Sequence, residues 1–332
     1  MIVSGYIAEG EFKGLRPGDE KILTHVNFAF AVVKEGRASV DHWKNSEKVR
    51  EFIKNKGNIK ALLSIGGWGA GGFSPACATP EGRELLAQTL VDIANDYGFD
   101  GVDLDWEYPC DDQAGIEASP DDKVNYTAWV QLLRDKLGNE KLVTMAAGGG
   151  QTIEGGYGYI NCLELDKLTK IMDLFNIMTY DMCGWKESSY HTSLYLSKTC
   201  RNRAGADAIR QYLEAGVPAS QLTLGAAFYG RVYSGTEGIN TFTPGPPGFT
   251  GGYKDTMERA EKAGGVNYDE AAEAPWFHNN EDKTLVTFDN PRSLKAKVDF
   301  IKSENLAGIM FWEYSCDDEN STLLKSIEGE LK

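Results

Sequence analysis

Several signals are missing from this 332-residue sequence, and each absence excludes a class of protein. No apolar run approaches the roughly 20 residues of a membrane-spanning helix, so we expect no membrane partner. No glycine-rich phosphate loop follows the first strand-like segment, which argues against an open dinucleotide-binding sheet. The six cysteines contain no C-x-x-C pair and the four histidines are scattered. We therefore expect neither a metal site nor a cofactor.

Basic residues are in short supply, with 34 Lys and Arg against 49 Asp and Glu and a net charge of −15. Such a charge repels phosphate, so we exclude nucleic acid as a partner. It suits a neutral or cationic substrate, although its simplest role is solubility. The segment Met1–Tyr6 has no basic part followed by an apolar part, so it is not a signal peptide. We expect a monomeric, extracellular protein whose signal peptide is absent from this sequence; a cytoplasmic location is the alternative.

The cysteines do not settle the compartment. A chain of this length forms an adequate core without disulfides, so free thiols and disulfides both stay open. The six residues are Cys77, Cys110, Cys162, Cys183, Cys200 and Cys316.

Short apolar runs alternate with amphipathic stretches along most of the chain. The runs are rich in branched and aromatic residues and end in glycine or polar residues, which predicts strands. The predicted strands are Ile2–Ala8, His25–Val33, Lys60–Gly67, Gly101–Glu107, Leu142–Gly149, Leu174–Asp181, Leu222–Gly230 and Gly308–Tyr314.

Helical spacing of apolar residues predicts helices between these strands, at Gly82–Tyr97, Val124–Leu137, Asp207–Ala215 and Ser293–Glu304. Alternation of about eight strands with helices predicts an α/β fold, a (β/α)8 TIM barrel. The rhythm breaks after the seventh strand, where turn-forming residues precede a short predicted helix, Asp255–Ala263, and a strand-like Leu285–Phe288. We therefore predict a catalytic barrel of residues 1–232 and 287–332 with a small α+β insertion of residues 233–286.

The fourth predicted strand carries three carboxylates at alternate positions. Side chains alternate faces along a strand, so Asp103, Asp105 and Glu107 share one face. A solvated acidic edge strand and a Mg²⁺ or Ca²⁺ site are the alternatives. The opposite face is apolar, however, which indicates a strand buried on both sides. Glu107 comes last, at the strand end where barrel active sites lie, so we favour a catalytic interpretation.

The segment Asp100–Glu107 resembles the D-G-x-D-x-D-x-E signature of the family 18 glycoside hydrolases, the chitinase family. Other motifs resemble the same family in the same order along nearly the whole chain. They are Ser64–Gly67 on strand three, Met178–Asp181 on strand six, Phe228–Arg231 at the end of strand seven and Met310–Glu313 on strand eight. The predicted insertion resembles the α+β domain of the deep-cleft chitinases.

This resemblance implies substrate-assisted hydrolysis with retention, in which the acetamido group of the −1 N-acetylglucosamine acts as the nucleophile. Glu107 would be the general acid and base. Asp105 would bind the acetamido N–H, with Asp103 sharing a proton beneath it. Tyr180 would bind the acetamido carbonyl, and Asp181 would contact the distorted sugar.

Aromatic residues should line the cleft, because sugar C–H faces pack on aromatic rings. Trp312 is the candidate for the floor of the −1 site. Trp106 faces away from Glu107, and we expect it to pack between barrel and helices. Arg231 either reaches the cleft or tethers the insertion. The remaining predicted binding residues are Trp185, Trp68, Tyr6, Phe30, Met178 and Tyr229.

Three functions stay open at this point. The first is hydrolysis of chitin or N-acetylglucosamine oligosaccharides, which the insertion favours because it would form one wall of a deep cleft. The second is endo-β-N-acetylglucosaminidase action on another glycan. The third is a non-catalytic chitin-binding lectin; such relatives typically lose the terminal Glu of the signature, whereas Glu107 is present here.

Overall fold

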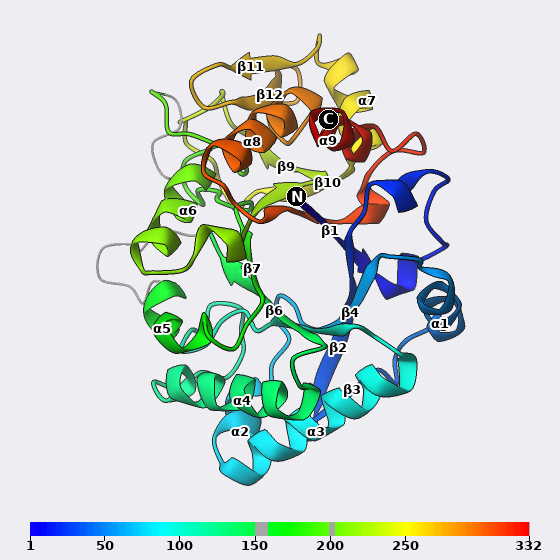
Figure 1. Ribbon diagram of the computed structural model, residues 1–332. Helices are drawn as coiled ribbons and strands as arrows, with labels where there is room; N and C mark the ends of the chain where they lie inside the picture. The colour runs from blue at the N-terminus through cyan, green and yellow to red at the C-terminus, as the bar shows by residue number, and fades with distance from the viewer. Residues whose placement is uncertain (150–158, 199–202, 332) are drawn as a thin grey trace.

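The computed structural model describes residues 1–149, 159–198 and 203–331. A closed ring of eight parallel strands forms its centre (Figure 1). The order around the ring is β1-β14-β8-β7-β6-β5-β4-β2, and pairing of β1 with β2 closes it. The fold is the predicted (β/α)8 barrel. Its strands are β1 (Ile2–Ala8), β2 (His25–Lys34), β4 (Lys60–Gly66), β5 (Gly101–Asp105), β6 (Leu142–Gly148), β7 (Leu174–Met178), β8 (Leu222–Ala227) and β14 (Gly308–Trp312).

Two strand ends differ from the prediction in a way that bears on function. We predicted that the fourth strand would run to Glu107, but β5 ends at Asp105, whose carbonyl accepts the backbone N–H of Gly67. Glu107 therefore lies just beyond the ladder. The seventh strand was predicted to reach Gly230, but β8 ends at Ala227 and the chain enters a second sheet at Tyr229.

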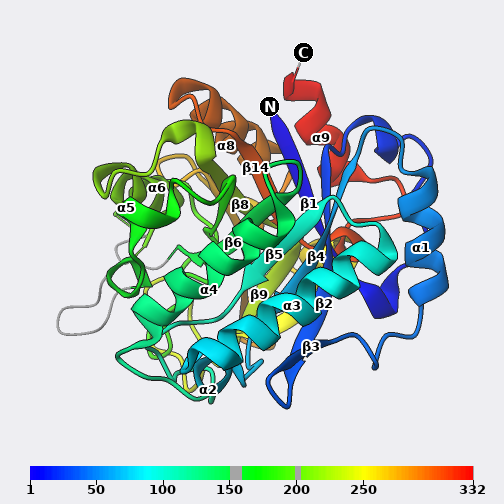
Figure 2. The same ribbon diagram turned by 60° about the horizontal axis from the view of Figure 1, so that its bottom comes forward.

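Helices pack around the outside of the ring (Figures 1 and 2). The helix α3 shows why they begin and end where they do: Thr79 caps its N-terminus by accepting the N–H of Gly82, and Gly98 ends it in a left-handed conformation. The sequence missed α1, α2, α5 and α9. The helices are α1 (Ser46–Asn55), α2 (Phe73–Cys77), α3 (Pro80–Tyr97), α4 (Asp122–Leu137), α5 (Leu165–Leu168), α6 (Gly205–Glu214), α8 (Pro291–Ser303) and α9 (Thr322–Leu331).

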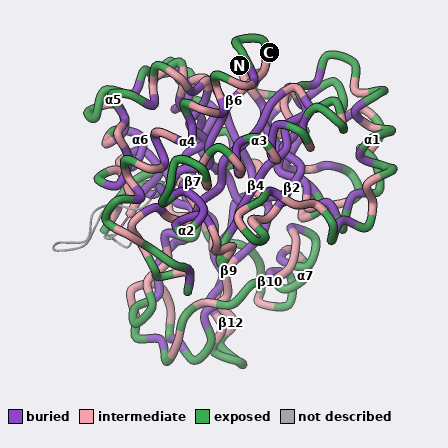
Figure 3. Tube along the Cα trace, turned by 90° about the horizontal axis from the view of Figure 1, so that it is seen from below, coloured by how far each residue is buried: buried purple, intermediate pink, exposed green. Residues whose placement is uncertain are grey.

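A second, antiparallel sheet projects from one side of the barrel (Figures 1 and 3). Its strand order is β10-β9-β13-β12-β11. It starts at Tyr229 and ends at Thr287, so it begins a few residues before the predicted insertion 233–286 and ends one residue after it; we keep the predicted limits as a proposal. The elements of this region are β9 (Tyr229–Ser234), β10 (Gly248–Gly252), α7 (Tyr253–Lys262), β11 (Asn267–Asp269), β12 (Ala274–Asn279) and β13 (Thr284–Thr287). Outside it, the short β3 (Arg37–Ser39) pairs antiparallel with the end of β2.

The apolar core lies between the strands and the surrounding helices. Trp106 is buried there and stacks on Phe73 with ring centroids 5.3 Å apart, which confirms its expected packing role. The two chain ends lie close together beside β1 (Figures 1 and 2). No helix in the described part of the chain is both long and apolar enough to cross a membrane.

Candidate active site

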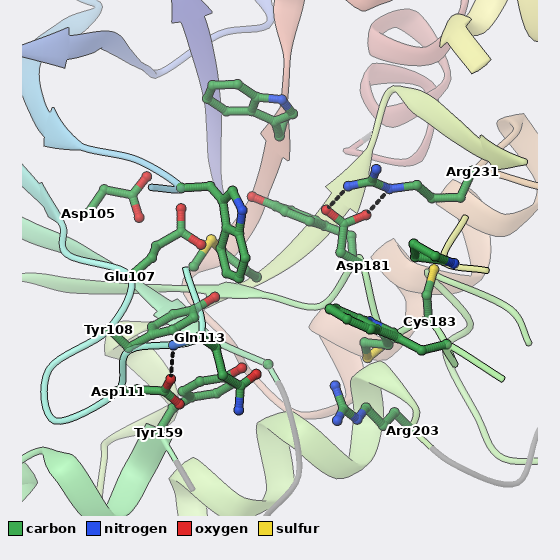
Figure 4. A pocket seen from close by; sticks show the side chains of 18 of the residues that line it. Asp105, Glu107, Tyr108, Asp111, Gln113, Tyr159, Asp181, Cys183, Arg203 and Arg231 are labelled. Atoms are coloured by element: carbon green, nitrogen blue, oxygen red, sulfur yellow. Dashed lines mark hydrogen bonds and ion pairs between the residues drawn. The ribbon is translucent and has the colours of Figure 1, made fainter. Parts of the chain in front are cut away.

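A cavity of about 1520 Å³ opens at the carboxyl ends of the barrel strands. Barrel residues such as Tyr6, Phe30 and Trp312 line it from one side. The second sheet lines it from the other, through Tyr229 and Arg231 of β9 and Phe249 of β10. The carboxyl groups of Asp105, at the end of β5, and of Glu107, just beyond it, point into the cavity (Figure 4). Active sites of TIM barrels lie at this end, so the cavity is the candidate active site.

Asp103 lies beneath the cavity, fully buried in the barrel interior. Its Oδ2 accepts the hydroxyls of Tyr6 at 2.7 Å and Ser64 at 2.8 Å. Its Oδ1 accepts the Thr144 hydroxyl at 2.5 Å and the Asn176 side-chain amide at 3.3 Å. Burial raises the pKa of Asp103, and these four hydrogen bonds oppose that rise. A carboxylate with four donors is well satisfied in its ionised form.

Asp105 sits one layer higher, at the cavity floor. It is 3 % exposed, and its Oδ1 has no hydrogen-bond partner in the structure. Burial raises its pKa well above the ordinary value, and the charges of Glu107 and Asp103 raise it further. Asp103 thus has hydrogen-bond donors that favour its ionised form, whereas Asp105 has like charges beside it that disfavour ionisation.

Glu107 reaches into the cavity from just beyond β5 (Figure 4). Burial raises its pKa to about 7, a hydrogen bond with Tyr108 lowers it, and the charge of Asp181 raises it. Tyr108 is itself held by Tyr159, with ring centroids 3.9 Å apart. A carboxyl group with a pKa near neutrality is suited to donate a proton and later take one back.

Asp181 lies across the cavity from Glu107, after β7 (Figure 4). Both of its oxygens accept from the Arg231 guanidinium, each at 2.6 Å. Buried His191 lies behind it, with Nδ1 3.5 Å from Oδ1. Burial would raise the pKa of Asp181, but the hydrogen bonds with His191 and Arg231 outweigh it and lower the pKa. Asp181 is therefore a fixed negative charge, and Arg231 joins the second sheet to the site.

An aromatic floor lies under the centre of the cavity. Trp312 stacks on Phe30 with ring centroids 5.5 Å apart and planes 12° apart, and Tyr6 tilts against it at 5.7 Å. Tyr180 stands beside this floor, with its hydroxyl 3.6 Å from the Met310 sulfur. Burial and the neighbouring carboxylates raise the pKa of Tyr180 well above the ordinary value, so its hydroxyl stays a neutral donor.

The structure gathers the predicted site residues around this one cavity. All of them except the deeper Asp103 line it, including Met178 and Tyr229. Trp68 and Trp185 lie at its rim, 63 % and 71 % exposed, as they must if they are to contact a ligand from solvent. Their placement leaves their individual roles as predictions.

Sequence reasoning missed the residues that support the site. Tyr108 and Tyr159 flank Glu107, and His191 lies behind Asp181. Thr144 and Asn176 bind Asp103 from β6 and β7. For Thr144 and Asn176 a signal was available, because each is a polar residue at an inward position of an otherwise apolar strand.

The described cysteines, Cys77, Cys110, Cys162, Cys183 and Cys316, are free thiols. The thiol of Cys110, at the wall of the cavity, donates to the Pro120 carbonyl at 3.9 Å. Cys200 lies outside the described residues. Within the described ranges, no group of three or more His, Cys, Asp and Glu side chains is arranged to hold a metal ion.

Comparison with known proteins gives a consistent result. The model of glycosyl hydrolases family 18 matches residues 2–317. Chitinase A1 of Niallia circulans is 33% identical over 86% of this chain and 44% of its own length, so the chain spans less than half of that relative.

Solved structures agree with the sequence match. The structure of a family 18 N-acetylglucosaminidase from Paenibacillus barengoltzii has a TM-score of 0.89 and 34% identity, and covers 99% of both chains. Chitinase ChiW from Paenibacillus sp., described as part of a cell-surface-expressed multi-modular enzyme machinery, has a TM-score of 0.86 and 31% identity over 100% of this chain and 43% of its own.

Proposed function

This chain belongs to family 18 of the glycosyl hydrolases, and from that premise we propose that it hydrolyses β-1,4-linked N-acetylglucosamine chains with retention by substrate-assisted catalysis. One observation carries the proposal. Glu107, with a pKa raised to about 7, opens into a cavity that has an aromatic floor and fixed polar groups around it. Such a site offers one acid beside a surface on which a pyranose ring can stack.

In the first step, the acetamido carbonyl oxygen of the −1 sugar attacks its own anomeric carbon. Glu107 donates a proton to the glycosidic oxygen as the bond between C1 and that oxygen breaks, and the shortened sugar leaves. Tyr180, a neutral donor, holds the acetamido oxygen for attack. The unprotonated oxygen of the Asp105 carboxyl accepts the acetamido N–H, and this hydrogen bond stabilises the positive oxazolinium ion. Orientation of the acetamide accounts for much of the rate, because the reacting atoms need not find each other.

In the second step, water attacks C1 from the side that the leaving sugar vacated. Glu107 now accepts the proton of that water, and the oxazolinium ring opens to restore the acetamide. The two inversions leave the product in the β configuration. Trp312 supports the distorted −1 ring, and Asp181, held by Arg231, binds its hydroxyls from the opposite wall. Trp68 and Trp185, at the rim of the cavity, bind sugars on the leaving-group side.

The test is product analysis on soluble N-acetylglucosamine oligomers with wild type and Glu107→Gln. We expect the β-anomer early in the wild-type reaction and loss of activity in a folded Glu107→Gln, since glutamine keeps the shape but has no proton to give. Early α-anomer would contradict retention. Unimpaired cleavage by Glu107→Gln would contradict its role as the acid.

A second activity is favoured by the N-acetylglucosaminidase from Paenibacillus barengoltzii, which this chain matches over nearly its whole length. Release of monomer alone from a hexamer would favour this activity, whereas dimers and trimers early in the reaction would favour internal cleavage. Cleavage of another N-acetylglucosamine glycan is tested by changing the substrate.

We also propose action outside the cell. The cell-surface expression described for the related ChiW supports this location, because a polymeric glycan cannot enter a cell intact. Monomeric behaviour remains our expectation, and light scattering of the purified chain tests it.

A further inference from the structure

The barrel interior holds a layer of polar side chains where TIM barrels usually have branched apolar ones. Seven of the eight strands contribute to it, and every member is at most 2 % exposed. Buried polar groups are costly unless each finds a partner, so the layer needs a reason. Its members are Ser4, Asn27, Ser64, Asp103, Thr144, Asn176 and Thr223.

Asp103 is the centre of this layer, and its hydrogen bonds favour its ionised form. It receives three hydroxyls and one amide, which together occupy both oxygens. An ionised carboxylate only accepts, so four donors match it fully. A protonated carboxyl would have to turn one of those donors away.

The amide of Asn176 contributes only in one orientation. Its NH₂ group donates to Asp103 at 3.3 Å, so its Oδ1 must face away. There the hydroxyl of Thr223 donates to that oxygen at 2.8 Å. Asn176 and Thr223 are direct neighbours across the β7–β8 pairing, and both are buried. If the amide turned over, its oxygen would face the Asp103 carboxylate and repel it, and the Thr223 hydroxyl would face an NH₂ group.

We propose that Asn176 and Thr223 are positioning residues that hold Asp103 ionised, so that the proton of the aspartate pair rests on Asp105, beneath the acetamido group. The inference rests on the proposed function, because the proton decides whether Asp105 presents a charge to Glu107, the acid of that function. When Asp103 carries the negative charge, Asp105, the member of the pair nearer Glu107, is neutral. With the charge moved to Asp105, Glu107 would face an additional anion.

Other titratable groups also face this pair. Tyr6 from β1, Tyr126 from α4 and Tyr180 after β7 all feel the charge of Asp103, and burial raises the pKa of each well above the ordinary value. They therefore remain neutral over the working range. They cannot take the proton that Asp103 and Asp105 share.

The experiment compares Thr223→Val, Thr223→Ser and Asn176→Leu with wild type. Valine has the shape of threonine without the hydroxyl, and serine restores the donor. Asn27→Leu is the matched control, because Asn27 is a buried amide of the same layer that donates to Ser4 at 3.4 Å rather than to Asp103. The unfolding temperatures of all variants report how much each substitution affects the stability of the fold.

The first readout needs no substrate. Carboxyl ¹³C titration should place the Asp103 midpoint below that of Asp105 in wild type, and the Asp103 midpoint should rise in Asn176→Leu and Thr223→Val. The second readout is kinetic: kcat should fall about ten- to a hundredfold in Asn176→Leu, the range set by loss of a hydrogen bond to a charged group. KM should change little, and the alkaline limb of kcat/KM should move to higher pH because Asp105 becomes charged.

Thr223→Ser should restore the wild-type titration and pH profile, and Asn27→Leu should leave both unchanged. An unshifted Asp103 midpoint in folded Asn176→Leu would overturn the inference, as would an equal shift in Asn27→Leu. Failure of the proposed function is a separate outcome: wild type would not cleave any N-acetylglucosamine oligomer, while the carboxyl titration would still decide where the proton rests.

Discussion

The pH dependence of hydrolysis tests how the environment of Glu107 prepares it for proton transfer. Burial raises its pKa to about 7, and Tyr108 and Asp181 act on it in opposite directions. Glu107 must be protonated to serve as the acid. We therefore expect kcat/KM to fall tenfold per pH unit above about 7, and Glu107 to be fully available as the acid well below that pH.

Tyr108→Phe is the informative perturbation. Its hydroxyl hydrogen bonds to the charged form of Glu107, which lowers the pKa, so its removal must raise the pKa. A hydrogen bond to a charged group contributes about 1.5 kcal/mol, and one pKa unit is about 1.4 kcal/mol, so the alkaline limb should move up by about one pH unit. Asp181→Asn removes a like charge and should move the limb down. The two variants should thus move the alkaline limb in opposite directions.

The assay is initial-rate hydrolysis of a soluble oligomer across the pH range, with kcat and KM separated at each pH. Tyr159→Phe is the control, because Tyr159 is the neighbouring tyrosine and its ring packs tilted against that of Tyr108. The alkaline limb of the Tyr159→Phe profile should stay in place. A limb that moves down in Tyr108→Phe, or moves equally in Tyr159→Phe, would refute the assignment of the hydrogen bond and leave general disturbance of the loop as the cause.

Other perturbations separate function from stability. Trp312→Ala should abolish most activity with little loss of thermal stability, whereas Trp106→Ala, in the core, should lower the free energy of unfolding by about 3–5 kcal/mol; chemical denaturation and rate assays of both decide. Asp105→Asn should cut kcat strongly in a folded protein, and a near-normal rate would refute its acetamide role. Lys297→Ala leaves a buried carboxylate unpaired and should lower the free energy of unfolding by about 3–5 kcal/mol. Lys295→Ala, on an exposed face of the same helix, should change it by less than about 1 kcal/mol in the same urea titration.

The barrel was readable from the sequence because its strands are buried on both faces and form nearly continuous apolar runs. Strand ends were less readable. The run around Asp105 and Glu107 continues in sequence beyond the point where the ladder stops, since hydrogen bonding depends on the neighbouring strands. That difference matters, because a residue beyond the ladder can turn its carboxyl into the cavity.

The second sheet was only partly predictable. The sequence indicated a helix near Asp255 and a strand near Leu285, and both occur, as α7 and β13. The strands β9 and β10 were missed. Only Phe228 separates β8 from β9, so the hydrophobic pattern shows one run where the structure has two strands in two sheets. Short strands such as β11 carry too few residues for a period to be recognised.

The signature residues were predictable because they share one short segment, but their support was not. Thr144, Asn176 and Thr223 come from three different strands, and each is an ordinary polar residue on its own. Whether they can act together beneath the site depends on the register of the strands, which places Asn176 directly beside Thr223. A slip of one residue between β7 and β8 would turn Asn176 out of the interior and leave Asp103 short of a donor. The hydrogen bonds that Asp103 receives thus depend on the pairing of strands far from it in sequence.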